Sequence, residues 1–166
     1  MGGRMTLFDR ATELILKHEG GYVYDAMDAG LETNMGISRR SYPDLDLKNL
    51  TREDAIAIYR RDFWDGQRCH QMPPAVALVF YDACINQGPY AAACDLQGAL
   101  GVPIDGILGP VTMAAVGALP PRDVVTRLVA RRAMRYALHR QLTRYGLGWF
   151  TRLADVAFVA AGPSVN

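Results

Sequence analysis

Paired prolines and capping residues divide this chain into short helical segments, and this punctuation constrains the fold more than any other feature. The proline pairs at 73–74 and 120–121 each precede an apolar stripe with helical spacing, and proline is tolerated in the first turn of a helix. Thr6 and Thr51 are suitable N-caps for two further helices. The sequence therefore predicts an all-α protein.

The same signals predict where each helix lies and what interrupts the series. The segments expected to be helical are 6–18, 38–42, 51–63, 73–86, 90–100, 111–118, 120–143 and 149–159. In the longest of them, the stripe expected to be apolar comprises Ala130, Ala133, Met134, Ala137 and Leu138. Residues 20–36 are rich in Gly, Asp and Asn, which predicts a loop or a short, irregular hairpin after the first helix.

Composition indicates a folded globular chain but identifies no partner. Half of the 166 residues are hydrophobic, and the net charge is only +1, whereas disordered chains combine few apolar residues with high net charge. Residues 122–144 hold seven arginines and one acidic residue. That segment could approach a polyanion or could be an ordinary solvated helix face, and we favour the solvated face.

The cysteines and the N-terminal region indicate the cellular compartment in which the protein is made. Cys69, Cys84 and Cys94 have no regular spacing, so they predict no disulfide framework, and the last two are expected in the core. The apolar stretch 7–16 is interrupted by charged residues, unlike a signal peptide, and no apolar run approaches a membrane span. We expect synthesis in the cytoplasm, so an external substrate would require a separate means of export.

Glu19 is the strongest candidate for acid–base chemistry. Hydrolysis of a glycosidic bond needs one group that protonates the leaving oxygen and a second that positions water or stabilises the developing positive charge. Glu19 follows a predicted helix end, where exposed carbonyl groups favour a protonated carboxyl group. Asp25 or Asp28, in the insertion, could lie opposite. A separation of ~6.5–9.5 Å would imply inversion, and ~5–5.5 Å retention.

Neighbouring residues could complete such a site. Thr33 and Asn34 could hold a water molecule by hydrogen bonds. The aromatic residues that could stack on sugar rings are Tyr22, Tyr24, Tyr59, Phe63 and Trp64. Core positions are favoured for Tyr59 and Phe63, whereas Trp64 lies between acidic residues and looks less like core. By themselves these residues also fit an exposed helix end followed by ordinary turns. The three histidines lack metal-ligand spacing, so no metal and no cofactor are expected.

Four ordered motifs resemble one known family. The run Leu-Lys-His-Glu-Gly-Gly-Tyr at 16–22 precedes the aspartates of the insertion and Thr-Asn-Met-Gly-Ile at 33–37. Together they resemble glycoside hydrolase family 108, the bacterial and phage N-acetylmuramidases. Segments 50–65 and 80–89 are similar to further family motifs, and 96–112 is similar to the family's predicted peptidoglycan-binding segment. The resemblance covers roughly residues 7–155.

The resemblance implies a lysozyme-like α-helical fold with a loop or short hairpin after the first helix. It implies a catalytic region, 1–88, and a helical peptidoglycan-binding segment, 89–166, packed as one compact unit. The implied activity is cleavage of the β-1,4 bond between N-acetylmuramic acid and N-acetylglucosamine by an endolysin or secretion-activator type of enzyme. The implied catalytic residues are Glu19 as acid, Asp28 as the preferred second carboxylate and Thr33 as the water-positioning residue. The implied substrate-binding residues are Tyr22, Asp25, Asn34, Trp64 and Asn86.

The implied partners are peptidoglycan glycan strands, with no nucleic acid, no stable membrane insertion and a monomeric protein. The enzyme would act in the periplasm or cell wall after release from the cytoplasm. Two alternatives stay open. One is a peptidoglycan-binding protein without catalysis, and the other is an enzyme acting on another N-acetylglucosamine polymer such as chitin, or a lytic transglycosylase.

The chain departs from the family pattern in the insertion. Leu31 stands where the family has a second glycine, Glu32 replaces a small residue and Met35 replaces an aromatic one. A leucine in a glycine-type conformation would be strained by ~1 kcal/mol or more. Glu32 would add a negative charge near the proposed pair of carboxyl groups. These departures bear on loop geometry and substrate preference and leave Glu19 unchanged.

Overall fold

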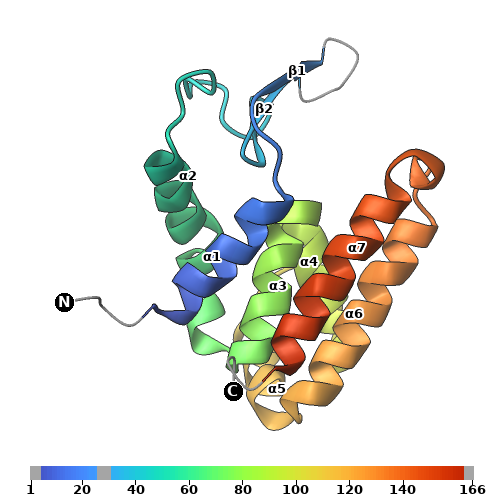
Figure 1. Ribbon diagram of the computed structural model, residues 1–166. Helices are drawn as coiled ribbons and strands as arrows, with labels where there is room; N and C mark the ends of the chain where they lie inside the picture. The colour runs from blue at the N-terminus through green and yellow to red at the C-terminus, as the bar shows by residue number, and fades with distance from the viewer. Residues whose placement is uncertain (1–4, 26–30, 163–166) are drawn as a thin grey trace. The chain divides into compact units, whose positions relative to one another are not determined.

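A computed structural model describes residues 5–25 and 31–162 (Figure 1), and the statements below concern this part of the chain. Its helices are α1 (Leu7–His18), α2 (Arg52–Ile58), α3 (Pro74–Gln87), α4 (Pro89–Leu100), α5 (Pro110–Ala118), α6 (Pro121–Ala137) and α7 (Leu142–Ala161). The strands are β1 (Val23–Asp25), β2 (Leu31–Asn34) and β3 (Ile37–Ser38). A π-helix (Tyr59–Asp65) and a 3-10 turn (Cys69–Gln71) join α2 to α3. The mainly α-helical class predicted from the sequence is confirmed.

The chain divides into two compact units, Met1–Asp62 and Phe63–Asn166. The division falls inside the π-helix rather than near residue 88. The functional division at residue 88 concerns which residues bind and which catalyse, and it stays a prediction. Each unit is described by itself below.

In the first unit, α1 and α2 begin directly after Thr6 and Thr51, the N-caps predicted from the sequence. The Thr6 hydroxyl accepts a hydrogen bond from the Asp9 amide at 3.2 Å, and the Asp9 carboxylate accepts one from the Thr6 amide at 2.9 Å. Thr51 and Asp54 make the same reciprocal pair at the start of α2. Aspartate therefore closes both capping boxes, in place of the usual glutamate or glutamine.

The insertion after α1 forms a three-stranded antiparallel sheet in the order β1-β2-β3, so the predicted hairpin is confirmed. Val23 pairs with Thr33, and Asn34 pairs with Ile37. The two residues between β2 and β3, Met35 and Gly36, have φ angles of 46° and 72°. Positive φ at both central residues is typical of a type I′ turn, which matches the twist of the flanking strands.

The brief helix expected at 38–42 is wrong. One turn forms there, in which the Tyr42 amide donates to the Ser38 carbonyl at 3.0 Å. The turn does not propagate, because Pro43 disfavours helical backbone at the preceding residue and has no amide hydrogen to donate.

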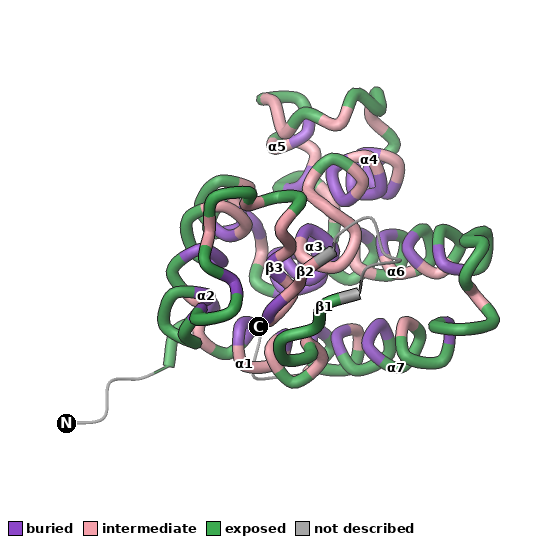
Figure 2. Tube along the Cα trace, turned by 90° about the horizontal axis from the view of Figure 1, so that it is seen from above, coloured by how far each residue is buried: buried purple, intermediate pink, exposed green. Residues whose placement is uncertain are grey.

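The second unit is built around α3, which packs against α4, α6 and α7. Residues 75–84 are all buried, and Figure 2 shows this helix almost wholly in the buried colour. An all-round apolar surface is typical of a helix surrounded by others. The predicted start of this helix at the proline pair is confirmed.

The prediction for the C-terminal helices is wrong in two respects. One helix was expected to reach residue 143, but α6 ends at Ala137 and α7 begins at Leu142, and the two lie side by side (Figure 1). The stripe expected to face the core is also wrong, because Met134 is 59% exposed and Leu138 is 80% exposed. The side chains that α6 buries are Val124, Leu128, Arg132 and Tyr136. Because Arg132 interrupts this buried face, apolar periodicity does not identify it.

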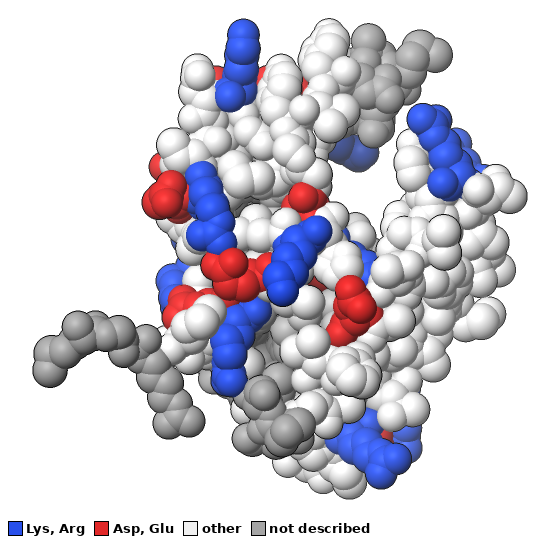
Figure 3. Space-filling view, in the orientation of Figure 1, with Lys and Arg blue, Asp and Glu red and all other residues white. Residues whose placement is uncertain are grey.

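Several arginines of the basic segment are used inside the second unit. Arg132 is fully buried and pairs with Asp82 at 2.6 Å, while Arg135 pairs with Asp95 at 2.8 Å. The surface over α7 in Figure 3 is mostly uncharged. This pairing supports an ordinary helix face rather than a continuous surface for a polyanion.

Cys69 and Cys84 are buried, Cys94 is half-buried, and all three are free thiols. Burial raises the pKa of the Cys84 thiol. No helix in residues 5–25 and 31–162 combines the length and the apolar character needed to cross a bilayer.

Candidate active site

Glu19 lies at the point where α1 gives way to the sheet. Its amide still donates to the Ile15 carbonyl at 3.1 Å, while its own backbone is extended, with φ −84° and ψ 135°. Glu19 is therefore the C-cap of α1, in agreement with the helix end predicted at His18. The helix places the carboxyl group and the following strand carries the chain away from it.

The turn between β2 and β3 is fastened to this helix end. The Met35 amide donates to the Gly20 carbonyl at 3.2 Å, and the Tyr59 hydroxyl donates to the Met35 carbonyl. Both backbone groups of Met35 are thus engaged, one with the residue after Glu19 and one with the start of the π-helix. These two bonds hold the turn in a single position relative to Glu19.

Gly36 lies directly against the Glu19 carboxyl group. A methyl group placed on Gly36 would be 2.6 Å from Glu19 Oε2 and 2.8 Å from the Tyr59 hydroxyl oxygen. Carbon and oxygen atoms that are not bonded do not approach so closely, so only glycine fits here. The φ of 72° at this residue also favours glycine. Glu19, Gly36 and Tyr59 therefore form one packed cluster.

This cluster packs against one side of the carboxyl group. Tyr59 is fully buried, as predicted, and its ring and hydroxyl form a rigid support. Gly20 and Gly21 have open space around them, since a methyl group on either would meet no atom within 4 Å. A carboxyl group that is held in place, beside backbone that a ligand can approach, can deliver a proton to a bound leaving group.

Thr33 and Asn34 have different environments. Thr33 lies in the central strand and pairs with Val23 on one side and Ser38 on the other. The Asn34 side chain is 7% exposed and donates to the Leu47 carbonyl at 2.8 Å. Asn34 therefore fastens the following loop to the sheet, and a contact between its side chain and a ligand stays a prediction. The role of Thr33 stays a prediction.

The two aspartates of the insertion are placed only in part. Asp25 ends β1 and pairs in register with Leu31, whereas Asp28 lies outside the described residues. Leu31 has extended backbone in β2, so the strain expected from a leucine at a glycine position is wrong. The positive φ falls at Met35 instead.

Glu32 does not add an unpaired charge. Arg39 Nε donates to Glu32 at 3.0 Å and Arg39 Nη1 donates to the Pro43 carbonyl at 2.9 Å. The hydrogen bond from Arg39 lowers the pKa of the Glu32 carboxyl group, and a hydrogen bond to Glu32 raises the pKa of the Tyr22 phenol. Tyr22 is 44% exposed, so its ring is accessible to a ligand.

Trp64 and Asn86 belong to the second unit. Trp64 is 5% exposed and packs edge-to-face on Tyr81, with ring centroids 5.1 Å apart. The expectation that Trp64 is not a core residue is therefore wrong. Asn86, near the end of α3, accepts a hydrogen bond from the Tyr136 hydroxyl and lines a cavity.

The contacts of Gly36 and Tyr59 with Glu19 were not foreseen from the sequence. A signal existed for the turn, because glycine at the second central position, here Gly36, is typical of two-residue type I′ hairpin loops. No sequence feature near the turn indicates a contact with Tyr59, because Tyr59 lies more than 20 residues further along the chain. Within residues 5–25 and 31–162, no cluster of three or more His, Cys, Asp or Glu side chains could hold a metal ion.

The chain is similar to a known protein family and to a solved structure. Residues 12–88 match the model of a family described as Glycosyl hydrolase 108. A solved structure titled "Structure of Brucella abortus SagA" is 30% identical, with a TM-score of 0.84, and the match covers 92% of each chain. No curated protein sequence matches this chain. The matched residues include the end of α1 with Glu19, the sheet and the π-helix.

Proposed function

The chain belongs to the glycosyl hydrolase 108 family, and on this premise we propose that it cleaves peptidoglycan as an N-acetylmuramidase. The bond cut is the β-1,4 linkage between N-acetylmuramic acid and N-acetylglucosamine. Glu19 is the general acid, and the enzyme acts as an endolysin-type hydrolase of the cell wall. The observation that carries this proposal is the packing of the Glu19 carboxyl group and the Tyr59 hydroxyl against Gly36.

The chemistry follows from that position. Protonated Glu19 donates its proton to the bridging oxygen as the bond to the anomeric carbon breaks, so the leaving sugar departs as a neutral alcohol. Positive charge develops on the remaining sugar ring and is stabilised by a second carboxylate, for which we propose Asp28. A water molecule, positioned by Thr33 in this proposal, then adds to the anomeric carbon and gives up a proton to one of the two carboxylates. The open backbone at Gly20 and Gly21 supports close passage of a glycan strand.

We also propose that residues 89–166 contribute to wall binding. Gln97 is 1% exposed and organises the loop after α4, since its Oε1 accepts from the Gly106 amide at 2.8 Å. The loop and its surroundings expose large apolar side chains, which are Tyr90, Ile104, Ile107 and Val111. An ordered loop that presents such side chains supports a binding role for this region.

The decisive experiment is digestion of purified peptidoglycan by wild type and Glu19→Gln. Glutamine has the same shape but no proton to donate, so the rate is expected to fall at least ~100-fold with unchanged thermal stability. The matched control is Glu13→Gln, an exposed glutamate on α1 that pairs with Arg52, which is expected to keep wild-type activity. Undiminished activity in Glu19→Gln would remove Glu19 from the proposed role.

Mass spectrometry of the products separates the related activities. Reducing N-acetylmuramic acid ends are expected for a muramidase, whereas anhydro ends would indicate a lytic transglycosylase. Release of sugars from chitin at a comparable rate would indicate a broader N-acetylglucosamine polymer hydrolase. Sedimentation with the wall and no soluble products would indicate a binding protein without catalysis.

A further inference from the structure

The outer side of α6 carries apolar side chains that the core does not take up. Ala130, Met134 and Leu138 follow one another at intervals of four residues, so they form a single row on the helix surface. We call these three residues the apolar row. Met134 is 59% exposed and Leu138 is 80% exposed. Contiguous exposed apolar side chains, unlike scattered ones, mark a surface that another molecule covers.

The apolar row lines an open groove of about 600 Å³ that α6 forms with α4. The basic residues of this groove, Arg131, Arg135 and His139, each follow a member of the row by one position. Arg131 lies against α4, because a methyl group on Gly98 would overlap its guanidinium group. Arg135 donates to Asp95 of α4 through Nε at 2.8 Å and through Nη2 at 2.9 Å. The row is therefore bordered along its length by basic side chains.

The net charge around the apolar row is positive. The chain has no Asp or Glu between residues 124 and 154, and the carboxylate of the groove is already paired. Arg127, Arg140 and Arg144 are exposed and make no ion pair within the described parts of the chain. Figure 3 shows basic and no acidic side chains at the end where α6 and α7 meet. A partner of this face is therefore expected to be anionic.

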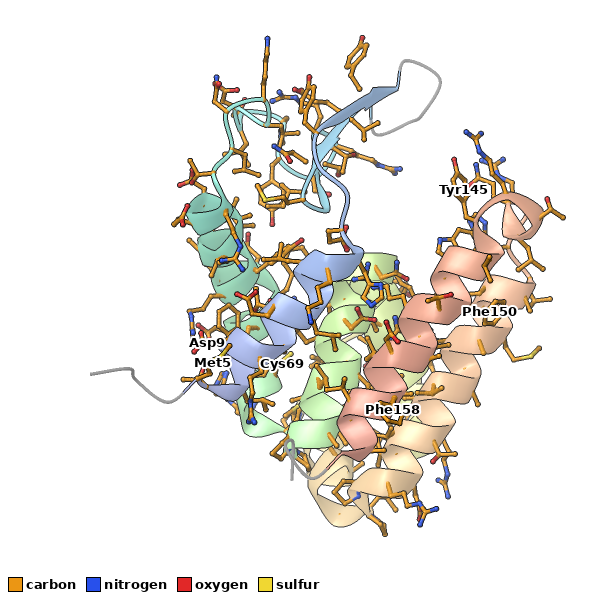
Figure 4. The ribbon with its side chains drawn as sticks, viewed as in Figure 1. Met5, Asp9, Cys69, Tyr145, Phe150 and Phe158 are labelled. Carbon is orange, nitrogen blue, oxygen red and sulfur yellow. The ribbon has the colours of Figure 1, made fainter. Side chains whose placement is uncertain are left out.

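Aromatic side chains lie beside the end of the apolar row. Tyr145 is 40% exposed and is labelled in Figure 4 near the turn between α6 and α7. Its ring centroid lies 5.9 Å from that of Trp149, which in turn meets the edge of His139 at 4.9 Å. Tyrosine and tryptophan are enriched where a protein crosses the boundary between lipid head groups and acyl chains. Their place beside exposed apolar and basic residues favours a lipid surface as the partner.

Two other partners fit this face less well. A second copy of the chain would bring the same arginines against these ones, and like charges across an interface repel. A soluble polyanion would leave Met134 and Leu138 exposed to water. A lipid surface satisfies both features, because the apolar side chains enter it while the arginines keep their charged groups at the level of the phosphates.

We propose that this face of α6 binds the surface of a bilayer that contains anionic phospholipids. Met134 and Leu138 enter the boundary between head groups and acyl chains, and Arg127 and Arg140 contact lipid phosphates. The helix lies along the surface and does not cross it. This inference goes beyond the proposed function and does not rest on it, because a pure lipid vesicle contains no peptidoglycan.

The test is sedimentation of the full chain with lipid vesicles. Vesicles of equal parts phosphatidylcholine and phosphatidylglycerol are expected to bind it saturably. Binding to phosphatidylcholine alone is expected to be at least ~10-fold weaker, because each basic residue near an anionic surface contributes about 5-fold in affinity. Added salt is expected to weaken binding to the anionic vesicles. Tryptophan emission gives a second readout, since Trp64 is 5% exposed and a change therefore reports on Trp149.

The double variant Met134→Gln with Leu138→Gln tests the apolar row. Both side chains are exposed, so the melting temperature is expected to be kept, while affinity for the anionic vesicles falls at least ~10-fold. Arg140→Gln is expected to weaken binding about 5-fold. Phe158→Gln is the matched control, because Phe158 is 83% exposed but lies toward the other end of α7 (Figure 4). Its affinity is expected to equal that of wild type.

Absence of saturable binding to the anionic vesicles would overturn the inference, as would equal affinity in the double variant and wild type. Heparin binding as tight as vesicle binding would show that charge alone accounts for the interaction, and it would overturn the inference too. Dimerisation that the double variant abolishes would assign the row to self-association instead. Peptidoglycan cleavage that survives in Glu19→Gln would contradict the proposed function alone and leave the vesicle result unaffected.

Discussion

At the scale of single residues, the candidate site depends as much on glycine as on the acid. Glu19 supplies the carboxyl group, but its position is set by contact with Gly36 and Tyr59. Met35 accepts a positive φ of 46° in the same turn, although a non-glycine residue in this conformation costs about 1 kcal/mol. Backbone strain of this kind is tolerated where the surroundings hold the chain in place, as the two hydrogen bonds of Met35 do.

Gly36→Ala tests this dependence. The added methyl group would overlap Glu19 Oε2 and the Tyr59 hydroxyl, and alanine at φ 72° is itself strained by ~1–2 kcal/mol. We expect a stability loss of at least ~1 kcal/mol and a fall in kcat of ~10-fold or more from displacement of the carboxyl group. Urea unfolding and digestion of purified peptidoglycan measure the two effects.

The control for this prediction is Gly117→Ala, at an exposed position of α5 where a methyl group meets nothing within 4 Å. It is expected to leave kcat unchanged and to stabilise the helix slightly. Wild-type kcat in Gly36→Ala would contradict the idea that packing positions Glu19.

At the scale of elements, the start of α1 contributes to the site at its other end. The helix has 12 residues, a length that is marginal for an isolated helix in water. The reciprocal Thr6–Asp9 cap satisfies two amides at its first turn. Asp9 also lies 3.7 Å from Arg60, within the same compact unit. The helix that presents Glu19 is therefore stabilised by its cap and by tertiary contacts.

Thr6→Ala is expected to lower the free energy of unfolding by about 1 kcal/mol, the usual value of such a cap. It should also change the pH dependence. The hydrogen bond from the Thr6 side chain is the main cause that lowers the pKa of the Asp9 carboxyl group below its usual 3.8. A lowered pKa in the folded state adds stability above pH 3.8, and this stability is lost as the pH falls through the folded-state value.

Urea titrations from about pH 5 to about pH 2 would measure this difference. Wild type is expected to lose more stability over that interval than Thr6→Ala, because the variant has already lost the bond. Thr151→Ala, at an exposed position within α7, serves as the control with an unchanged pH profile. Parallel profiles for wild type and Thr6→Ala would contradict the role of this cap.

At the scale of the whole molecule, the second unit is joined by one buried carboxylate. Asp82, on α3, accepts from Arg132 Nη2 of α6 at 2.6 Å and from Arg152 Nε of α7 at 2.7 Å. Arg132 also donates to the Tyr136 hydroxyl oxygen at 3.1 Å. Three helices are thus held in register by charges that water does not screen.

Arg132→Met tests how much this network contributes to the free energy of unfolding. Methionine has similar length but leaves the buried Asp82 carboxylate with one cation instead of two, and removing a partner from a buried pair costs about 3–5 kcal/mol. We expect the low end of that range, because Arg152 remains. Denaturant unfolding measures it, with Arg122→Met, at an exposed position of the same helix, as the control. Equal stability of the two variants would show that the network contributes nothing net.

The resemblance of the sequence to glycoside hydrolase family 108 agrees with the family match and with the fold. A TM-score of 0.84 over 92% of the chain confirms the mainly α-helical, lysozyme-like fold. The sequence alone also determined the features that depend on near neighbours. Thr6, Thr51 and the proline pairs mark helix starts because capping bonds and fixed proline φ angles act within a few residues. Glu19 at the end of α1 and a hairpin after it follow from the same local rules.

Only the tertiary structure decided what depends on distant partners. Arg132 faces the core because Asp82, 50 residues away in the chain, neutralises it, so apolar periodicity misidentified the buried face of α6. Trp64 is buried against Tyr81 despite its acidic neighbours, and Asn34 is engaged by Leu47. The support of Glu19 by Gly36 and Tyr59 is of the same kind. Local sequence acts through the backbone of adjacent residues, whereas burial and pairing depend on which groups folding brings together.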